Sequence, residues 1–217
     1  KSRTTRGEPT VAIVGYTNAG KSTLLNSLVG SSVVHAEDRL FATLDPTSRR
    51  VRLPGGLHAI VTDTVGFIHK LPHQLVDAFR ATLEEVERAD LLLEVVDASD
   101  RHRDEHRATV QLVLEELGAA AKPRLVVANK VDRLGGNDTG VPGSLPVSAS
   151  TGIGIDRLRA ALERELRQQG SPIDLELPYS AVGSAEALRA RHGLQLDYGA
   201  TSLHVRGFAP PAVAAEL

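Results

Sequence analysis

Short runs of aliphatic residues alternate with amphipathic stretches along the first 170 residues of the chain. Apolar runs rich in Val and Leu at 10–15 (TVAIVG), 91–97 (LLLEVVD) and 124–129 (RLVVAN) predict buried strands. Helical periodicity predicts helices at about 21–29, 74–89, 103–117 and 154–169. Because strands and helices alternate, the pattern predicts an α/β fold with a mainly parallel sheet flanked by helices and joined by right-handed crossovers.

Two further runs add a hairpin to this sheet. RRVRLP at 49–54 and HAIVTD at 58–63 flank the pair Gly55–Gly56, which is typical of a β-hairpin. The segment 133–146, RLGGNDTGVPGSLP, is rich in Gly and Pro and predicts a loop. We find no internal repeat in the sequence, which disfavours a repeat architecture.

The pattern changes where Gly170 and Pro172 interrupt the helical periodicity. The following residues predict a strand, a helix at about 182–192 and two more strands. A segment of about 45 residues is short for an independent core, so we expect it to pack on the main domain. The expected organisation is a linker at 1–9, a main domain at 10–170 and a small α+β C-terminal domain at 171–217.

The composition narrows the function classes. The chain has 217 residues, of which 41% are hydrophobic and 24% charged, as in a globular protein with a real core. The net charge of −2 gives no overall attraction to nucleic acid or membranes, and the absence of Cys excludes disulfides, thiol catalysis and Cys-bound zinc. No apolar run approaches the roughly 20 residues of a membrane span. The first residue is Lys1 rather than Met, from which we expect a fragment of a longer protein.

The sequence GYTNAGKS at 15–22 fits the pattern Gly-x-x-x-x-Gly-Lys-Ser between a predicted strand and a predicted helix. In that context backbone N–H groups surround a β-phosphate, and the helix N-terminus adds its dipole. We expect Lys21 to reach the β- and γ-phosphate oxygens and the Ser22 hydroxyl to bind Mg²⁺. The alternative, a Gly-rich turn with an incidental lysine, is disfavoured by the flanking elements. The motif predicts a nucleoside-triphosphate site.

The sequence DTVG at 63–66 ends the second strand of the predicted hairpin. A carboxylate there can hold Mg²⁺ through a water, which is the role expected of Asp63. Gly66 allows its backbone N–H to approach the γ-phosphate closely. The pattern alone is weak, because any junction of a strand and a turn can show it. Its place some 40 residues after the phosphate loop strengthens it.

The sequence NKVD at 129–132 points to guanine. Guanine presents two adjacent donors, N1–H and the 2-amino group, and the Asp132 carboxylate can accept both, whereas adenine would leave it unpaired. We expect Asn129 to contact the 6-oxo side and the Lys130 stem to lie over the ring. The sequence VSAS at 147–150 follows the next short strand, and the Ala149 N–H is expected to donate to the guanine 6-oxygen.

A threonine that completes the Mg²⁺ shell is expected between the first two motifs, within DRLFATLDPTSRR at 38–50. Spacing alone does not choose between Thr43 and Thr47. Either one can instead cap a turn next to Pro46.

In this order the motifs GYTNAGKST, LFATLDPT, DTVGFI and NKVD resemble those of the HflX family of ribosome-associated GTPases. The resemblance extends from about Arg6 to the C-terminus. It implies a P-loop GTPase domain of the translation-factor class, with GTP or GDP and Mg²⁺ as ligands. It also implies that FATLD is switch I, with Thr43 as the metal ligand as in related Obg-type sequences, and that an N-terminal domain precedes this chain.

The residues expected to bind the nucleotide belong to these motifs. They are Gly15, Tyr16, Thr17, Asn18, Ala19, Gly20, Lys21, Ser22, Phe41, Ala42, Thr43, Leu44, Asp45, Asp63, Thr64, Val65, Gly66, Asn129, Lys130, Val131, Asp132, Ser148, Ala149 and Ser150. Among them Lys21, Thr43 and Gly66 are expected to act in catalysis. Ser22, Thr43 and Asp63 are expected to hold Mg²⁺, Asp63 through a water.

Phe67 stands where Ras-type enzymes carry the glutamine that orients the attacking water. A phenylalanine cannot hold a water, so we expect slow intrinsic hydrolysis, on the order of 10⁻⁴ to 10⁻² s⁻¹. A partner that reorders the switches and retracts Phe67 would then activate the enzyme. The alternative is that Phe67 only packs in the core beneath the second switch.

The resemblance implies the large ribosomal subunit as partner, reached mainly through the missing N-terminal domain, and a role in splitting or rescuing ribosomes. We expect a cytoplasmic monomer and leave peripheral membrane association open. One rival function, an ATP-dependent kinase or ATPase, is disfavoured by NKVD and VSAS. Another, a GTP-binding interaction module without meaningful hydrolysis, is not separated by the sequence. The C-terminal segment lacks a basic stripe, which favours support or a protein contact over RNA binding there.

Overall fold

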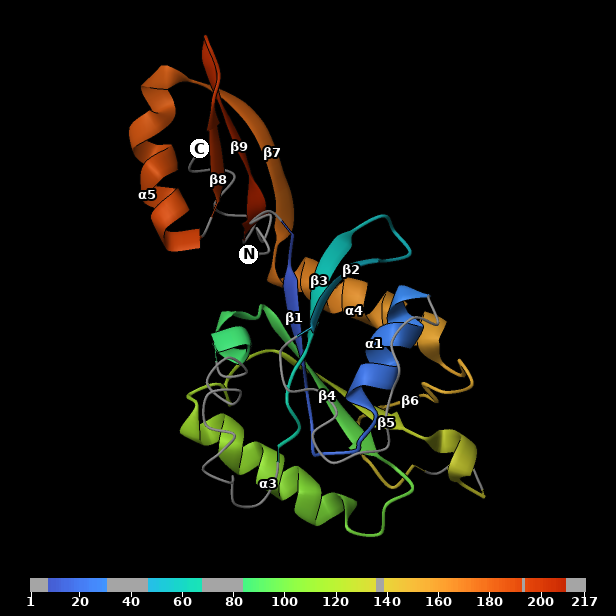
Figure 1. Cartoon of the computed structure of the whole chain (residues 1–217). Coiled ribbons are helices and arrows are strands. Elements are labelled where there is room, and N and C mark those ends of the chain that lie inside the picture. The colour runs from blue at the N-terminus through green and yellow to red at the C-terminus, as the bar shows by residue number, and fades with distance from the viewer. Residues whose placement is uncertain (1–7, 31–46, 68–83, 136–138, 193, 210–217) are drawn as a thin grey trace. The chain divides into compact units, whose positions relative to one another are not determined.

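The computed structural model describes residues 8–30, 47–67, 84–135, 139–192 and 194–209 (Figure 1). Within the chain, Thr10–Glu163 form one compact unit, and a second unit begins at Arg164. The division falls inside helix α4 (Ile155–Gln169), a few residues before the predicted boundary between 170 and 171.

The first unit contains a six-stranded sheet in the order β2-β3-β1-β4-β5-β6 (Figure 1). Its strands are β1 (Thr10–Val14), β2 (Thr47–Arg52), β3 (His58–Asp63), β4 (Leu91–Asp97), β5 (Arg124–Asn129) and β6 (Leu145–Pro146). All neighbouring pairs are parallel except β2 with β3, which form the antiparallel hairpin. The central strands are buried on both faces, and this explains their continuous runs of Val, Leu and Ile.

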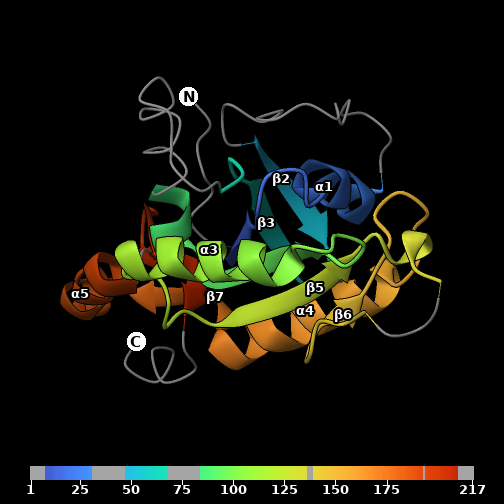
Figure 2. The ribbon, with the colours of Figure 1, turned by 90° about the horizontal axis from the view of Figure 1, so that it is seen from below.

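Helices cover both faces of this sheet. Helix α1 (Lys21–Val29) buries Leu24, Leu25 and Leu28, and helix α3 (Arg103–Glu116) buries Val110 and Leu114. Figure 2 shows α3 and α4 on opposite sides of β5. The parallel sheet, the hairpin and these helices confirm the sequence predictions. Of the helix predicted at 74–89, the structure describes residues 84–89, of which 84–88 are helical.

The strand register brings the predicted motifs to one edge of the sheet. Ile13 pairs with Asp63 across β1 and β3, and Asp97 pairs with Asn129 across β4 and β5. The carboxyl ends of parallel strands meet at the same edge, which is where open α/β sheets bind their ligands. The phosphate loop after β1, the DTVG motif after β3 and NKVD after β5 therefore converge.

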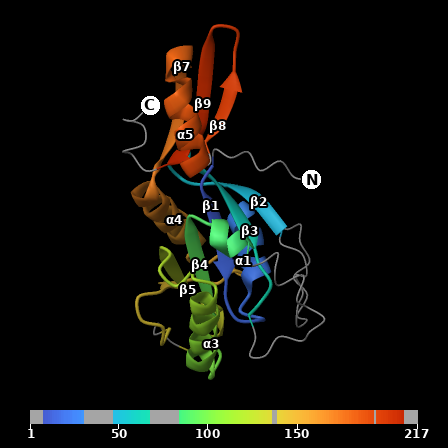
Figure 3. The same cartoon turned by 90° about the vertical axis from the view of Figure 1, so that its left-hand side faces the viewer.

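The second unit is a three-stranded antiparallel sheet with one helix. Its strands β7 (Ser171–Pro178), β8 (Gln195–Tyr198) and β9 (Ser202–Ala209) lie in the order β7-β9-β8. Helix α5 (Val182–His192) follows the short 3₁₀ turn η3 (Tyr179–Ala181) and packs along the sheet (Figure 3). Apolar side chains between them form a separate core, made of Ile173, Ala185, Leu188, Leu194, Leu203 and Val205.

Among the described residues, no helix is both long enough and apolar enough to cross a membrane.

Candidate functional site

The phosphate loop joins β1 to α1 through a conformation that requires glycine. Gly20 precedes the first residue of α1 with a φ of 93°, in the left-handed region. A Cβ atom at Gly20 would lie 2.4 Å from Nδ2 of Asn129, so the backbone approaches this side chain as closely as glycine permits. The loop therefore ends at a helix N-terminus, whose free N–H groups and dipole favour a phosphate.

Lys21 is the cation of this loop, and its side chain is only 7% exposed. Its Nζ donates a hydrogen bond of 3.1 Å to the Tyr16 carbonyl oxygen. Burial lowers the pKa of Lys21 from 10.5 to about 8, although the nearby Asp63 carboxylate acts to raise it. A buried ammonium gains most from a partner of opposite charge, and a triphosphate supplies one.

Ser22 and Asp63 lie together next to Lys21. The Ser22 hydroxyl donates to Oδ2 of Asp63 at 2.6 Å, and Asp63 is only 2% exposed. Mg²⁺ prefers oxygen ligands and keeps several waters, so a hydroxyl and one carboxylate beside a phosphate loop suit it. No cluster of three or more His, Asp or Glu side chains that could bind a metal occurs in the described part of the chain. The oxygen pair fits the predicted magnesium site.

The DTVG motif approaches the phosphate loop from β3. The Thr64 hydroxyl is fully buried and donates to the Ile13 carbonyl at 2.6 Å, which fixes the turn against β1. A Cβ at Gly66 would lie 2.7 Å from Cα of Thr17 and 3.0 Å from Nζ of Lys21. Only a glycine permits this approach, which places the Gly66 backbone beside Lys21; the contact of its N–H with a γ-phosphate stays a prediction.

Phe67 is fully buried in the core of the first unit. Its side chain belongs to a cluster that includes Val14, Val86 and Leu114. Its N–H donates to the Gly15 carbonyl at 3.1 Å, and its carbonyl accepts from the Thr17 N–H at 3.0 Å. In this structure Phe67 thus packs in the core and pairs with the phosphate loop. This arrangement is compatible with the hypothesis that Phe67 is a packing residue, and a role in blocking the catalytic position stays a prediction.

Asn129 connects the guanine motif to the phosphate loop. Its Nδ2 donates to the Ala19 carbonyl at 2.9 Å, and its Oδ1 accepts from the Ala149 N–H at 3.0 Å. The Ala149 N–H that we expect at the guanine 6-oxygen would therefore be shared with Asn129. The base contacts expected of both residues stay predictions, while their role in joining three motifs is observed.

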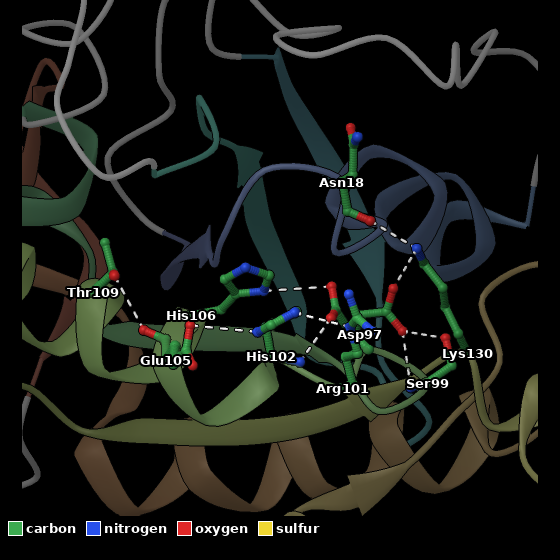
Figure 4. Close-up of polar contacts among 10 residues, drawn as sticks. Asn18, Asp97, Ser99, Arg101, His102, Glu105, His106, Thr109 and Lys130 are labelled. Atoms are coloured by element: carbon green, nitrogen blue, oxygen red, sulfur yellow. Dashed lines mark hydrogen bonds and ion pairs between the residues drawn. The ribbon is translucent and has the colours of Figure 1, made fainter.

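Lys130 makes a second connection to the phosphate loop (Figure 4). Its backbone adopts a φ of 64°, which is uncommon for a residue other than glycine and is typical of functional sites. Its Nζ donates to the Asn18 carbonyl at 2.8 Å and forms an ion pair of 2.7 Å with Asp97. These two contacts fix the ammonium end of the Lys130 side chain, whose stem is predicted to lie over the base.

Asp97 is a site residue that the sequence analysis missed. Burial acts to raise its pKa, but hydrogen bonds from Lys130 and from Ser99 outweigh burial and leave the pKa below its ordinary value. Asp97 therefore stays charged and orients Lys130. Its position at the carboxyl end of β4, in line with the other motifs, was the signal that could have identified it.

Asp132 is exposed in the 3₁₀ turn η2 (Val131–Arg133), immediately after Lys130. The Val131 N–H donates to the Val147 carbonyl at 3.2 Å, so NKVD and VSAS lie side by side. Ser148 is fully buried and its hydroxyl lies 3.1 Å from that of Ser150. The Asp132 carboxylate is thus exposed beside these segments, and its contact with guanine stays a prediction.

The residues of the predicted switch I, Phe41, Ala42, Thr43, Leu44 and Asp45, lie outside the described residues. Thr47 is the first residue of β2 and pairs in register with Asp63. The choice between Thr43 and Thr47 as metal ligand stays a prediction.

Comparison with known proteins agrees with this geometry. Residues 10–130 match a family described as 50S ribosome-binding GTPase. A protein named GTPase HflX from Caldanaerobacter subterraneus is 51% identical over 183 residues, covering 84% of this chain and 42% of that protein. Another GTPase HflX, from Escherichia coli, is 45% identical, covering 82% of this chain and 43% of that protein. The chain belongs to the HflX family of GTPases.

The chain spans about half the length, or less, of the HflX relatives that it matches. For example, it covers 50% of the length of the GTPase HflX from Lacrimispora saccharolytica. Solved structures support the fold of the HflX GTPase domain. A variant of Era from Aquifex aeolicus bound to GDP and AlF₄⁻ has a TM-score of 0.64 at 26% identity, covering 73% of this chain and 57% of that one. A GTP-binding protein from Sulfolobus solfataricus in complex with GDP has a TM-score of 0.60 at 29% identity, covering 74% and 53%.

The chain also contains a ring contact that no motif indicated. The Tyr16 ring stacks on His106 of α3 with centroids 3.8 Å apart and an angle of 8° between planes. His106 in turn lies 3.5 Å from Asp100, measured from Nδ1 to Oδ2. Tyr16 is the residue whose carbonyl accepts from Lys21, so α3 supports the phosphate loop. Ninety residues separate the two rings, and no local pattern links them.

The lowered pKa of Lys21 predicts that nucleotide binding depends on pH. Phosphates favour the charged ammonium and raise its pKa, so binding takes up a proton wherever the free side chain is partly neutral. With a starting pKa of about 8, uptake on GTP binding should be about a quarter of a proton at pH 7.5 and three-quarters at pH 8.5. Affinity should therefore weaken as pH rises through 8. Calorimetry in two buffers of different ionisation enthalpy measures the uptake.

The matched control for this measurement is Lys21→Arg, because a guanidinium does not titrate in this range. It should bind with no uptake at pH 8.5. Equal uptake by the wild-type protein at the two pH values would contradict the low pKa.

Proposed function

We propose that this chain binds GTP with Mg²⁺, hydrolyses it slowly on its own, and is activated on the large ribosomal subunit. The observation that carries the proposal is the contrast at the end of β3. Lys21, Ser22, Asp63 and Gly66 come together as a phosphate and metal site, while position 67 holds a buried phenylalanine. The first four residues can bind phosphate and metal, but the Phe67 side chain cannot orient a water.

The chemistry assigned to the chain follows from these contacts. Lys21 transfers its hydrogen bond from the Tyr16 carbonyl to the β- and γ-phosphate oxygens and stabilises charge that develops there. The Gly66 N–H approaches the γ-phosphate, and Asp132 accepts the two guanine donors. Ser22, and Asp63 through a water, would hold Mg²⁺, which would supply positive charge to the phosphates when bound. Thr43 is proposed to complete its shell.

The ribosomal partner is proposed from family membership. The matching family carries the description 50S ribosome-binding GTPase, and the longer HflX relatives include a region that this chain does not span. We assign GTP binding to residues 10–170, place the small α+β domain at 171–217, and treat 1–9 as the linker to an N-terminal domain. Ribosome splitting or rescue in the cytoplasm, by a monomer, is the proposed role of the whole protein.

Single-turnover hydrolysis of GTP tests this function. The chain alone should turn over on the order of 10⁻⁴ to 10⁻² s⁻¹. Purified large ribosomal subunits should raise the rate severalfold or more, because the complex supplies what Phe67 lacks. Lys21→Ala is the control and should lose hydrolysis under both conditions.

Two outcomes would redirect the proposal. Tight GTP binding with no hydrolysis in either condition would favour the alternative of a switch that changes partners without meaningful turnover. Hydrolysis that subunits do not change would contradict activation of this chain by the ribosome. Repeating the measurement with the full-length protein then shows whether the N-terminal domain is required for activation.

A further inference from the structure

The ring of Tyr16 connects the phosphate loop to helix α3. It stacks on the imidazole of His106, with 3.8 Å between the ring centroids and 8° between their planes. Two flat rings this close and this nearly parallel touch over most of their faces. Both side chains are half-buried, so each ring also shields one face of the other from water. The stack therefore stabilises one position of the Tyr16 side chain.

Asp100, shortly before α3, fixes the orientation of the imidazole. Its Oδ2 lies 3.5 Å from Nδ1 of His106. The carboxylate is itself held, because its Oδ1 accepts from the His102 N–H at 2.8 Å. The Asp100 carbonyl accepts from the Arg103 N–H at 3.3 Å, which joins this residue to the start of the helix. We call Asp100 and His106 the ring support.

A cavity of about 40 Å³ lies beside the stack, between the phosphate loop and α3. A volume of this size has room for about three waters. Its walls are residues 16–19 of the loop, residues 94–97 of β4, Asp100, and Arg103, His106, Arg107 and Val110 of α3. The described side chains thus leave part of the space between the loop and the helix unfilled, whereas the two elements touch at the stack.

The backbone of Tyr16 links two parts of the nucleotide site. Its carbonyl accepts the hydrogen bond of 3.1 Å from Nζ of Lys21. Tyr16 also forms a parallel bridge with Phe67. In this bridge the Phe67 N–H donates to the Gly15 carbonyl at 3.1 Å, and the Thr17 N–H donates to the Phe67 carbonyl at 3.0 Å. A displacement of Tyr16 would therefore shift both the acceptor of Lys21 and the pairing with the residue after DTVG.

The segment that contains Asp100 also holds the loop at a second point. Asp97, at the end of β4, forms an ion pair of 2.7 Å with Lys130. Nζ of Lys130 donates to the Asn18 carbonyl at 2.8 Å. The connection between β4 and α3 thus reaches the loop at both Tyr16 and Asn18, although none of the predicted nucleotide motifs includes it.

We propose that His106 is a positioning residue for nucleotide binding, which holds the phosphate loop in its phosphate-binding conformation through the stack on Tyr16. The apparent affinity for a ligand falls with the fraction of protein in the competent conformation, so a loop held in place binds more tightly. Bound phosphates fix the same loop through its N–H groups. The ring support therefore affects binding and has little effect on the hydrolysis of bound GTP. The inference rests on the proposed function only in taking GTP as the ligand.

Three variants of two histidines on α3 test this role. His106→Ala removes the ring, and His106→Phe keeps a flat ring but loses the contact with Asp100. The matched control is His102→Ala, one turn earlier on the same helix, where the side chain contacts Arg101 and Glu105. The measurements are GTP affinity with a labelled nucleotide, single-turnover hydrolysis at saturating GTP, and denaturant unfolding.

His106→Ala should bind GTP more weakly by about two- to tenfold, the range expected from the loss of one stacked aromatic pair. Its hydrolysis rate at saturating GTP should stay within about twofold of the wild-type rate, because the loss of a contribution to binding alone raises KM and leaves kcat unchanged. His106→Phe should recover most of the affinity, and His102→Ala should bind GTP like the wild-type chain.

A purely structural histidine gives a different result. In that case His106→Ala would lower the free energy of unfolding, while the folded protein would bind GTP as tightly as the wild-type chain, and this outcome overturns the proposal. A loss of affinity that His106→Phe does not restore contradicts the assignment to ring stacking. His106→Gln, which lacks the ring but keeps a polar side chain near Asp100, replaces the alanine variant if that variant does not fold.

Hydrogen exchange in the nucleotide-free chain separates this role from the proposed function. The Thr17 N–H is bonded to the Phe67 carbonyl at 3.0 Å. The Ala19 N–H is bonded to the Tyr16 carbonyl at 3.3 Å. In His106→Ala both groups should exchange at least about twofold faster, because the loop opens more often. Failure of the wild-type chain to bind GTP contradicts the proposed function, whereas unchanged exchange in His106→Ala contradicts the inference whether or not GTP binds.

Discussion

Replacing Asp132 with Asn should weaken GTP binding by about 10²- to 10⁴-fold, because two hydrogen bonds to a charged group contribute about 1.5–3 kcal/mol each. The asparagine side chain keeps one acceptor and adds a donor that faces the guanine 2-amino group. Xanthine carries a 2-oxo acceptor at that position, so the same variant should bind xanthosine triphosphate better than the wild-type protein does. Competition between the two nucleotides, measured by fluorescence with a labelled nucleotide, gives both affinities.

The position of Asp132 allows this substitution to test base recognition without a change in folding stability. Asp132 is exposed in η2, so the amide should leave the stability of the fold unchanged. Asp104→Asn, at an exposed position in the first turn of α3, is the matched control for the loss of one carboxylate and should leave both affinities as they are. A variant that still prefers GTP by the wild-type ratio would show that Asp132 does not contact the base.

Phe67→Ala should lower the free energy of unfolding by about 3–5 kcal/mol, the usual cost of truncating a fully buried phenylalanine. The cavity would open among Val14, Val86 and Leu114 and would also loosen the backbone pairing with the phosphate loop. Denaturant unfolding monitored by circular dichroism measures the loss. Phe67→Leu fills more of the space and should cost clearly less.

The hydrolysis rate of the same variants bears on the hypothesis that Phe67 blocks the catalytic position. If packing is its role, Phe67→Leu should fold and hydrolyse GTP at the wild-type rate. A loss of under about 1 kcal/mol in Phe67→Ala, with faster intrinsic hydrolysis, would instead support a side chain that blocks the site and is retracted by a partner.

Local signals explain which parts of this site could be predicted. Helix α1 begins directly after Gly20 and ends before Gly30. Both glycines adopt the left-handed conformation, which a helix cannot continue. The phosphate loop and NKVD are short segments whose residue types are each required by one contact, so spacing alone reveals them. Their convergence follows from parallel strands that end at one edge.

The parts that escaped prediction depend on contacts between distant segments. Asp97 orients Lys130 from the neighbouring strand, and His106 stacks on Tyr16 across the interface of α3 and the loop. Local conformation requires neither residue type. The signal for Asp97 was its position at the carboxyl end of β4, and His106 had none. The hydrogen bonds by which Asn129 connects three segments were likewise not predicted, because the motif indicated only a contact with the base.

The two connections from NKVD to the phosphate loop also set the order in which this site can form during synthesis. Asn129 bonds to Ala19 across 110 positions, and Lys130 bonds to Asn18 across 112. Contacts of such large sequence separation form only after the intervening chain is available. While β5 is still inside the ribosome exit tunnel, the phosphate loop lacks both of these supports, although its own residues emerged long before. Nucleotide binding is therefore acquired late in translation, when most of the domain has already been made.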